Sequence, residues 1–221
     1  MRILVLDSAL AHCIAALVVD DVVVASRSEA CKQGHEAVLP VMVRDVLNEA
    51  GNNGDPDLVA VTVGPGSFTG IRAGLALAHG IGLALAVPVV GVTVGEAIAD
   101  AFPHLGERVL WIVTDSRRGH IFLERGAEII SLAREALPLP AGKVAIAGNA
   151  ALHVAARLAA AGANVMLTDA RFALARHIAS VAARRHAGDI PARAAQPLYV
   201  DPPEARLPAG GMRPPPTSSG R

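Results

Sequence analysis

Residues 58–72 have the sequence LVAVTVGPGSFTGIR. The first six form an apolar run of the kind that is buried on both faces of a parallel sheet. A glycine-rich turn follows at Gly64–Gly70, and an apolar helix-forming stretch continues to about Ala86. Another β-branched run begins at Pro88 and ends at Val92. Strand, turn, helix and strand in this order predict a βαβ unit of an α/β fold.

Three strand-like segments and a helix precede this unit. The strands are expected at residues 3–7, 13–19 and 22–26, with Asp20-Asp21 as a hairpin turn. Residues 35–50 carry apolar side chains at helical spacing, and Thr93-Val94-Gly95-Glu96 has the form of a capping box. The resulting order βββαβαβα is the layout of the ribonuclease-H-like half shared by the actin, Hsp70 and sugar-kinase superfamily.

The chain is expected to divide into two lobes and a tail. Residues 1–105 form the ribonuclease-H-like first lobe, and Phe102–Gly106 marks the boundary. Residues 106–200 form a reduced second lobe, and residues 201–221 form a Pro-rich disordered tail. The elements expected in the second lobe are strands at 109–114, 120–123 and 144–147, a helix at 150–161 capped by Asn149, and a helix at 172–186.

Composition excludes several classes of function. The 221 residues include 20 Lys+Arg and 20 Asp+Glu, and only 3% are aromatic. A neutral chain with scattered aromatic residues is a poor candidate for binding nucleic acid alone. Cys13 and Cys31 form no CxxC pair, which favours a reducing, cytoplasmic compartment. Residues 73–95 are apolar enough to cross a membrane, but Pro88 divides them, so a buried helix and strand are expected instead.

The glycine-rich turn is the first candidate for binding an anion. Backbone N–H groups at a helix N-terminus attract phosphate, and Gly64, Gly66, Ser67 and Thr69 lie at this position. The turn lacks the Gly-Lys-Ser/Thr ending of a P-loop, and Pro65 offers no N–H. The alternative is a tight turn in which Ser67 or Thr69 only caps the helix.

Two other segments offer charged side chains for a phosphate site. Asp7 ends the first strand, where it could orient a nucleotide's Mg²⁺ through water or could be a solvated strand end. Two-metal nuclease chemistry is not expected, because Thr62-Val63-Gly64 supplies no second carboxylate. Arg117 and Arg118 lie in a turn and could bind phosphate or a partner carboxylate, or could be solvated.

Hydrolytic sites are not expected in this sequence. None of the eight histidines lies three to five positions from another, so no helical zinc pair is predicted. His35-Glu36 begins like HExxH, but Leu39 occupies the second ligand position. The serine of Gly64-Pro65-Gly66-Ser67 does not have the spacing of a Gly-x-Ser-x-Gly elbow. We therefore predict neither a catalytic residue nor a metal site.

The helix after the turn carries a stripe of small residues: Gly70, Gly74, Ala78 and Gly82. Small residues at every fourth position let another helix or a sheet approach the backbone closely. Its other faces are also apolar, so the helix is expected to be buried on several sides. The stripe could face the interior of the domain or a partner chain.

Residues 63–72 and the following Gly74-Leu75-Ala76 and Gly80 closely resemble the hallmark segment of the TsaB (YeaZ) family. Supporting matches are Ile3–Ser8, His35 with Leu39-Pro40, Asp115–Gly119 as a DxRRG-like turn, and Pro197-Leu198-Tyr199 as a closing strand. The resemblance covers residues 1 to about 200 and implies an actin/Hsp70-like fold.

The resemblance also implies a function and a set of partners. A TsaB-like chain would be a non-catalytic activating subunit that pairs with the transferase TsaD, and the ATPase TsaE would dock on the pair. Synthesis of N6-threonylcarbamoyladenosine in tRNA would be carried out by the complex, and this chain would meet tRNA only there. No tightly bound cofactor is expected, although ATP or ADP could lie at a shared interface. Homodimerisation of the isolated chain stays open.

The resemblance assigns candidate residues to two surfaces. The partner interface would use the first two helices, and its candidates are Val38, Met42, Gly70, Gly74, Ala78 and Gly82. The residues that would lie near a nucleotide are Asp7, Gly64, Gly66, Ser67, Thr69, Arg72, Arg117 and Arg118. The alternative function is an ATP-dependent small-molecule kinase of the same superfamily, which would use Asp7 and the glycine turn.

Overall fold

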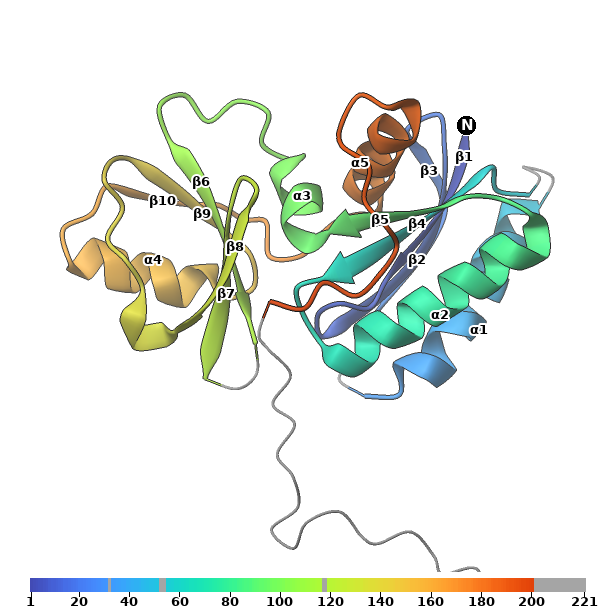
Figure 1. The fold of residues 1–221 in the computed structure, drawn as a ribbon, viewed down its shortest axis with the longest axis horizontal. Coiled ribbons are helices and arrows are strands. Elements are labelled where there is room, and N and C mark those ends of the chain that lie inside the picture. Colours follow the sequence, from blue (N-terminus) through green and yellow to red (C-terminus); the bar gives the residue numbers. More distant parts are fainter. Residues whose placement is uncertain (32, 52–54, 117–118, 201–221) are drawn as a thin grey trace, which may run out of the picture.

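Two five-stranded sheets form the framework of the molecule and lie side by side in Figure 1. The computed structural model describes residues 1–31, 33–51, 55–116 and 119–200. The elements of the first half are β1 (Arg2–Asp7), β2 (His12–Val19), β3 (Val22–Ala30), α1 (His35–Ala50), β4 (Leu58–Gly64), α2 (Phe68–Leu85), β5 (Val89–Thr93) and α3 (Val94–Ala99). The elements of the second half are β6 (Val109–Asp115), β7 (His120–Arg125), β8 (Glu128–Ala133), the 3₁₀ helix η2 (Arg134–Ala136), β9 (Val144–Ala147), α4 (Ala151–Ala160), β10 (Val165–Leu167) and α5 (Ala175–Ala187).

The first sheet has the strand order β3-β2-β1-β4-β5. The first three strands form an antiparallel meander, β4 runs parallel to β1, and β5 runs parallel to β4. Asp20 and Asp21 have φ values of 46° and 67°, the left-handed conformations that a two-residue hairpin turn requires. Every residue of β4 is buried, as its apolar run predicts. The predicted ribonuclease-H-like layout is therefore confirmed.

Helices cover both faces of this first sheet. α1 and α2 lie together on one face and α5 lies on the other (Figure 1). Leu39, Met42 and Val46 of α1 are buried, as the helical spacing of apolar residues predicts. The capping box of α3 is also confirmed, because the Thr93 hydroxyl accepts from the Glu96 N–H at 2.9 Å and the Glu96 carboxylate accepts from the Thr93 N–H at 2.8 Å. The first lobe consequently has three layers.

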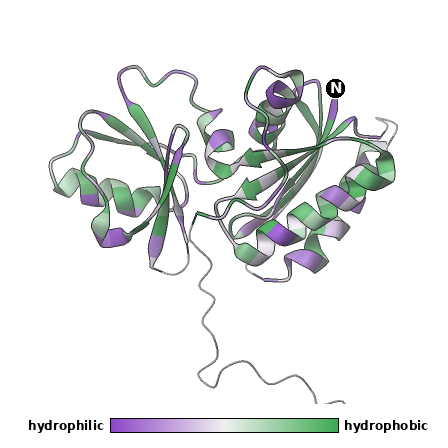
Figure 2. Ribbon diagram, in the orientation of Figure 1, coloured by the Kyte–Doolittle hydropathy of each residue, from purple (hydrophilic) through white to green (hydrophobic). Residues whose placement is uncertain are grey.

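α2 is long and apolar enough to cross a membrane when judged by length and composition alone. In the structure it packs against β4, β1 and α1, and 33% of the tested window is buried. Figure 2 shows hydrophobic residues along much of this helix and along the strands that it covers. The predicted helix and strand are observed on either side of Pro88, but within this chain only the face of α2 that is turned to the sheet is buried.

The second sheet repeats the topology of the first with fewer residues. Its order is β10-β9-β6-β7-β8, so β6 to β10 correspond in sequence to β1 to β5. The counterpart of α1 is reduced to the three residues of η2, and α4 has 10 residues where α2 has 18. β8 and β10 were missed by the sequence pattern because β8 is only half-buried along most of its length and β10 has three residues. The second lobe is therefore a shortened copy of the first.

Two predictions for the second half are wrong. Asn149 does not cap α4, because its side-chain oxygen accepts instead from the backbone N–H of Asp115 at 2.9 Å. The helix expected at 172–186 does not complete the second lobe, since α5 packs on β1, β2 and β5 of the first sheet. Its buried face, which includes Ile178, Val181 and Ala182, covers the side of that sheet opposite α1 and α2. The expected tail, residues 201–221, lies outside the described residues.

Candidate functional site

A small cleft lies where three loops meet between the two sheets. Its walls are the segment Ala9–Ala11 after β1, Gly66 and Ser67 before α2, and the end of β6 with Asn149. Its volume is about 120 Å³. Pockets that enclose drug-sized ligands usually have volumes of about 300–1,000 Å³. Of the residues predicted near a nucleotide, Gly66 and Ser67 line this cleft.

The glycine-rich turn is closed against the loop that follows β1. The backbone N–H of Ser67 donates to the carbonyl oxygen of Ala9 at 2.6 Å. A Cβ atom added at Gly66 would overlap the same carbonyl group, so only glycine permits this approach. Ser67 caps α2 through its side chain, which accepts from the N–H of Gly70 at 3.3 Å. Two donors of the proposed phosphate cradle are thus already engaged within the chain.

The Asp7 side chain stabilises the same loop after β1 through a hydrogen bond to its backbone. This side chain is 3% exposed, and Oδ1 accepts from the N–H of Ala9 at 2.9 Å and from the hydroxyl of Thr62 at 2.5 Å. Burial raises the pKa of this carboxyl group, and these two hydrogen bonds oppose the increase. The expectation of a solvated strand end is wrong. Asp7 lies behind the cleft wall rather than in the cleft, which does not favour a role in orienting a bound metal.

Arg72 is engaged by the segment that follows α5. Its Nε and Nη2 atoms donate to the hydroxyl of Tyr199 at 3.0 and 2.7 Å, and its guanidinium lies 3.7 Å from the ring centroid of Phe68. The N–H of Leu198 donates to the carbonyl of Val63 at 2.9 Å. Residues 197–199 were expected to form a closing strand; they form none, but this bond holds them beside β4. Arg72 therefore contacts the chain's own aromatic residues at this surface.

The other predicted basic residues cannot be placed in this site. Arg117 and Arg118 lie outside the described residues. Next to them, Asp115 lines the cleft and accepts from Arg134 at 3.1 Å, and Ser116 donates through its hydroxyl to the carbonyl of His120 at 2.9 Å. Thr69 is exposed at the first turn of α2, and Gly64 packs near Ile71 and Leu198. Neither Thr69 nor Gly64 lines the cleft.

The small-residue stripe of α2 faces the interior of this chain. A Cβ atom at Gly70 would overlap the carbonyl oxygen of Ser8, and one at Gly74 would lie 2.6 Å from the Ser8 hydroxyl oxygen. A Cβ atom at Gly82 would overlap Val89, and Ala78 is 0% exposed. Its assignment to a partner interface is therefore wrong, because the stripe serves close packing of α2 on the first sheet. Met42 is likewise buried, at 5% exposure, while Val38 is half-buried.

The opposite face of α2 is exposed and nearly uncharged. Leu83 is 86% exposed, and Ala76 and Gly80 are also exposed. Within the described part of the chain, no atom beyond the adjacent backbone of α2 lies within 4 Å of a Cβ built at Gly80. Val41 on neighbouring α1 is 46% exposed. We call these four residues the outer face. A second series of small residues, Ala73, Ala76 and Gly80, has the spacing that could have revealed this surface in the sequence.

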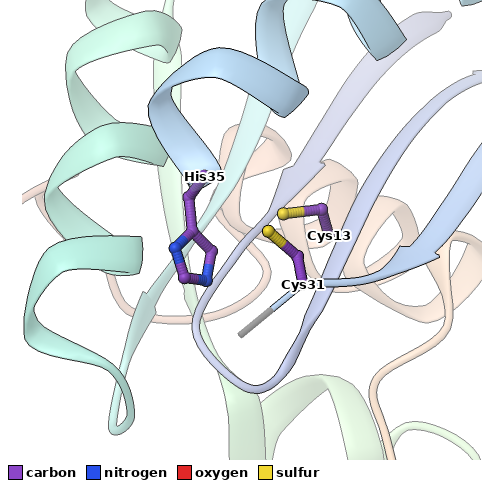
Figure 3. A group of neighbouring side chains, drawn as sticks. All are labelled: Cys13, Cys31 and His35. Atoms are coloured by element: carbon purple, nitrogen blue, oxygen red, sulfur yellow. The ribbon is translucent and has the colours of Figure 1, made fainter. Parts of the chain in front are cut away.

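A cluster of two cysteines and a histidine was not predicted from the sequence. Cys13, Cys31 and His35 are all buried, and one ligand atom from each lies within 4.8 Å of the others. Figure 3 shows the two sulfur atoms side by side, with the His35 ring next to them. Spacings of 18 and 4 residues match no common metal motif, and the strand pairing that brings the cysteines together becomes visible only in the fold.

Comparison with known proteins identifies the family. The model of the family "TsaD: tRNA N6-adenosine threonylcarbamoyltransferase" matches residues 23–185. The chain belongs to the TsaD family. The matched range begins in β3 and ends within α5, so it includes the glycine turn, α1, α2 and all five strands of the second sheet.

Similarity to TsaB proteins confirms the resemblance found in the sequence. The chain is 35% identical to Escherichia coli "tRNA threonylcarbamoyladenosine biosynthesis protein TsaB" over 55% of its own length and 53% of that protein. Identity to the Buchnera aphidicola TsaB is 30%, over 54% of this chain and 58% of that protein. The chain therefore spans about half the length of the curated relatives it matches.

Solved structures confirm the predicted fold of this TsaD-family chain. A Pseudomonas aeruginosa protein described as similar to peptidase YeaZ superposes with a TM-score of 0.73 and 24% identity, covering 90% of this chain and 99% of that one. The structure "YeaZ from Pseudomonas aeruginosa" gives a TM-score of 0.69, again with 24% identity, over 90% and 100% of the two chains. The two-lobed α/β architecture with a reduced second lobe is thus shared with YeaZ.

Proposed function

We propose that this chain is a non-catalytic activating subunit in the synthesis of N6-threonylcarbamoyladenosine in tRNA. It pairs with a TsaD-type transferase, a TsaE-type ATPase docks on the pair, and tRNA is met only through the complex. Membership of the TsaD family and the similarity to TsaB proteins support this assignment. A neutral chain with few aromatic residues fits a subunit that leaves tRNA binding to its partners. The proposed location is the cytoplasm.

The geometry around the cleft supports a partner role over chemistry within this chain. The Asp7 carboxyl group is buried and bonded to Ala9 and Thr62, and the Ser67 N–H is bonded to Ala9. A nucleotide bound here by this chain alone would have to separate these loops and enlarge a cleft of about 120 Å³. We therefore place any ATP or ADP of the complex at an interface that the partner completes.

The proposal that this chain pairs with a partner rests on the exposed outer face of α2. Its small residues let a helix approach closely, and an 86% exposed leucine is an apolar anchor that water solvates poorly. α1 packs beside α2 and carries another exposed apolar side chain, Val41. We propose that a helix of the TsaD-type partner packs on this face. A homodimer of the isolated chain would use the same surface.

The test is copurification with a TsaD-type partner combined with measurement of tRNA modification. Gly80→Leu and Leu83→Glu change the outer face at positions where the fold leaves room. Each is expected to weaken the pairing at least about tenfold. A tenfold loss of affinity corresponds to about 1.4 kcal/mol, and the loss of one central interface residue usually costs more than that. The matched control is Leu152→Glu on α4, which changes a leucine that is 65% exposed in the second lobe.

Two results would overturn the proposal. If both outer-face variants bind the partner and support tRNA modification as the unchanged chain does, the partner does not bind at α2. Tight ATP binding by the isolated chain, lost in Asp7→Ala, together with phosphorylation of a small molecule, would instead support the superfamily kinase. Bulky substitutions at Gly74 or Ala78 are unsuitable for this test, because those positions are packed inside the chain.

A further inference from the structure

The connection between β3 and α1 brings three metal-ligating side chains into the interior. Cys13 on β2 is 0% exposed, Cys31 after β3 is 4% exposed, and His35 at the start of α1 is 2% exposed. Their ligand atoms lie within 4.8 Å of one another. Two sulfur atoms and one imidazole nitrogen form a ligand set that selects soft or borderline ions such as Zn²⁺.

The His35 ring supplies an independent sign that a ligand belongs here. Its Nε2 atom is buried and has no hydrogen-bond partner among the residues that the structure describes. Buried polar atoms are nearly always paired, since an unpaired one costs about 1–3 kcal/mol. The ring edge that carries Nε2 lies beside Gly70 of α2, because a Cβ atom built there would lie 3.2 Å from both Nε2 and Cδ2. An ion bound through Nε2 would give this nitrogen the partner that it lacks among the described residues.

The strand register favours a shared ion over a disulfide. Cys13 lies opposite Glu29, and Cys31 extends the ladder two residues further, with its N–H donating to the Ala11 carbonyl at 3.1 Å. Such diagonal neighbours have Cα atoms roughly 7–8 Å apart. A disulfide requires Cα atoms about 4.4–6.8 Å apart. Zinc–sulfur bonds of about 2.3 Å span a larger gap, because they hold sulfur atoms roughly 3.8 Å from each other.

The surroundings of the cluster are also suited to a cation. Asp7 on β1 and Glu29 on β3 act electrostatically on Cys13. Burial, followed by the contact with Cys31, raises the pKa of the Cys13 thiol to about 12. The Cys13 thiol is therefore protonated at neutral pH, and a bound ion would displace its proton.

We infer that Cys13, Cys31 and His35 form a buried binding site for a structural Zn²⁺ ion. The ion replaces the thiol protons of Cys13 and Cys31, which leave for solvent, and the lone pair of His35 completes three protein bonds. The fourth ligand is a water molecule or the carbonyl oxygen of Gln33, which now accepts from the Cys31 thiol at 3.2 Å. The ion joins β2 to the start of α1 and so fixes the helix that packs beside α2.

The experiment loads the purified full-length chain with Zn²⁺ or Co²⁺, removes unbound metal and measures the bound ion. We expect about one equivalent per chain, and the cobalt form should show thiolate-to-cobalt charge-transfer absorption. Cys13→Ala, Cys31→Ala and His35→Asn should each lose the ion. His153→Asn, on the exposed surface of α4, is the control for adventitious binding to histidine and should retain it.

A second measurement uses the unchanged chain alone, so that a variant that fails to fold does not decide the outcome. Zinc should slow alkylation of both thiols at least about tenfold and raise the midpoint of thermal unfolding, because binding stabilises only the folded state. Substoichiometric metal, unchanged alkylation, or equal metal content in Cys31→Ala would overturn the site. A Cys13–Cys31 disulfide in the protein purified without reductant would overturn it as well.

Discussion

Arg185 on α5 and Glu96 on α3, 89 residues apart in the sequence, form an ion pair in which Nη2 of the arginine lies 2.5 Å from Oε1 of the glutamate. The arginine side chain is 5% exposed, and it also donates to the carbonyl groups of Gly91 at 2.6 Å and Pro191 at 2.8 Å. Burial alone would raise the pKa of Glu96, but hydrogen bonds from Arg185 and Thr93 outweigh it and lower the pKa. This pair joins the last helix to the first lobe.

Arg185→Met should therefore destabilise the whole chain. The variant keeps most of the apolar stem but leaves two carbonyl groups and the half-buried Glu96 without their donor. We expect a loss of about 2–4 kcal/mol in the free energy of unfolding, near the lower end for a broken buried pair because Arg193 also contacts Glu96 at 3.3 Å. Urea unfolding followed by circular dichroism measures it. Arg176→Met, at an exposed position of α5, is the control, and equal midpoints for the two variants would contradict this role.

The sequence predicts local features well because their determinants lie a few residues apart. The α3 capping box needs only Thr93 and Glu96, and the hairpin turn needs only Asp20-Asp21. The order of strands and helices along the first lobe followed from its apolar runs and the turns between them. Contacts between residues that are far apart in the sequence were not predicted. Gly70 packs on Ser8, 62 residues away, and Arg185 bonds to Gly91, 94 residues away.

The same limit explains the errors at the candidate site. A stripe of small residues indicates a close approach but does not say whether a sheet of the same chain or a partner makes it. Asp7 at a strand end has the same sequence signature whether its carboxyl group is solvated or, as observed, bonded beneath the loop to Ala9 and Thr62. Cys13 and Cys31 share a site only because β2 and β3 pair in one particular register.

Two glycines of α2 should respond in opposite ways to the same substitution. Gly80→Ala adds a methyl group into open space on the outer face and removes the helix penalty of glycine, so we expect a gain of about 0.5–1 kcal/mol. Gly70→Ala places its methyl group on the backbone carbonyl of Ser8, which cannot retreat without moving the β1 loop, so we expect a loss of about 1–3 kcal/mol. Thermal unfolding of both variants measures the difference. Equal shifts would mean that the stripe does not face the sheet.

Asp7 should matter through its hydrogen bonds rather than through its charge. Asp7→Asn keeps an acceptor for the Ala9 N–H and the Thr62 hydroxyl, and it removes the cost of ionising a buried group whose pKa is raised. We expect the unfolding free energy of Asp7→Asn at neutral pH to equal or exceed that of the unchanged chain. Asp7→Ala leaves both donors unpaired and should cost about 1–3 kcal/mol. A larger loss in Asp7→Asn than in Asp7→Ala would show that the negative charge itself is needed.

Glu124 should make stability depend on pH. It lies on β7, is 3% exposed, and approaches α3 so closely that a Cβ atom at Gly95 would overlap its carboxylate. Burial is the main reason that the pKa rises from 4.5 to about 8. Hydrogen bonds from Thr93 and Gly95 and the charge of Arg193 oppose the rise, whereas the charge of Glu96 adds to it. Its Oε1 atom has no partner among the described residues.

The sign of the effect follows from proton binding. Between pH 4.5 and about 8 the folded chain holds a proton at Glu124 that the unfolded chain has released. Stability from this group is therefore complete below pH 4.5 and is lost as the pH rises towards 8, with a slope of at most about 1.4 kcal/mol per pH unit. Glu124→Gln mimics the protonated form, so it should match the unchanged chain near pH 5 and exceed its stability near pH 8. Urea unfolding across this range measures both curves, with Glu128→Gln, an exposed residue of β8, as the control. Parallel curves for Glu124→Gln and the unchanged chain would mean that Glu124 is ionised in the fold, with a cation or water reaching it between the lobes.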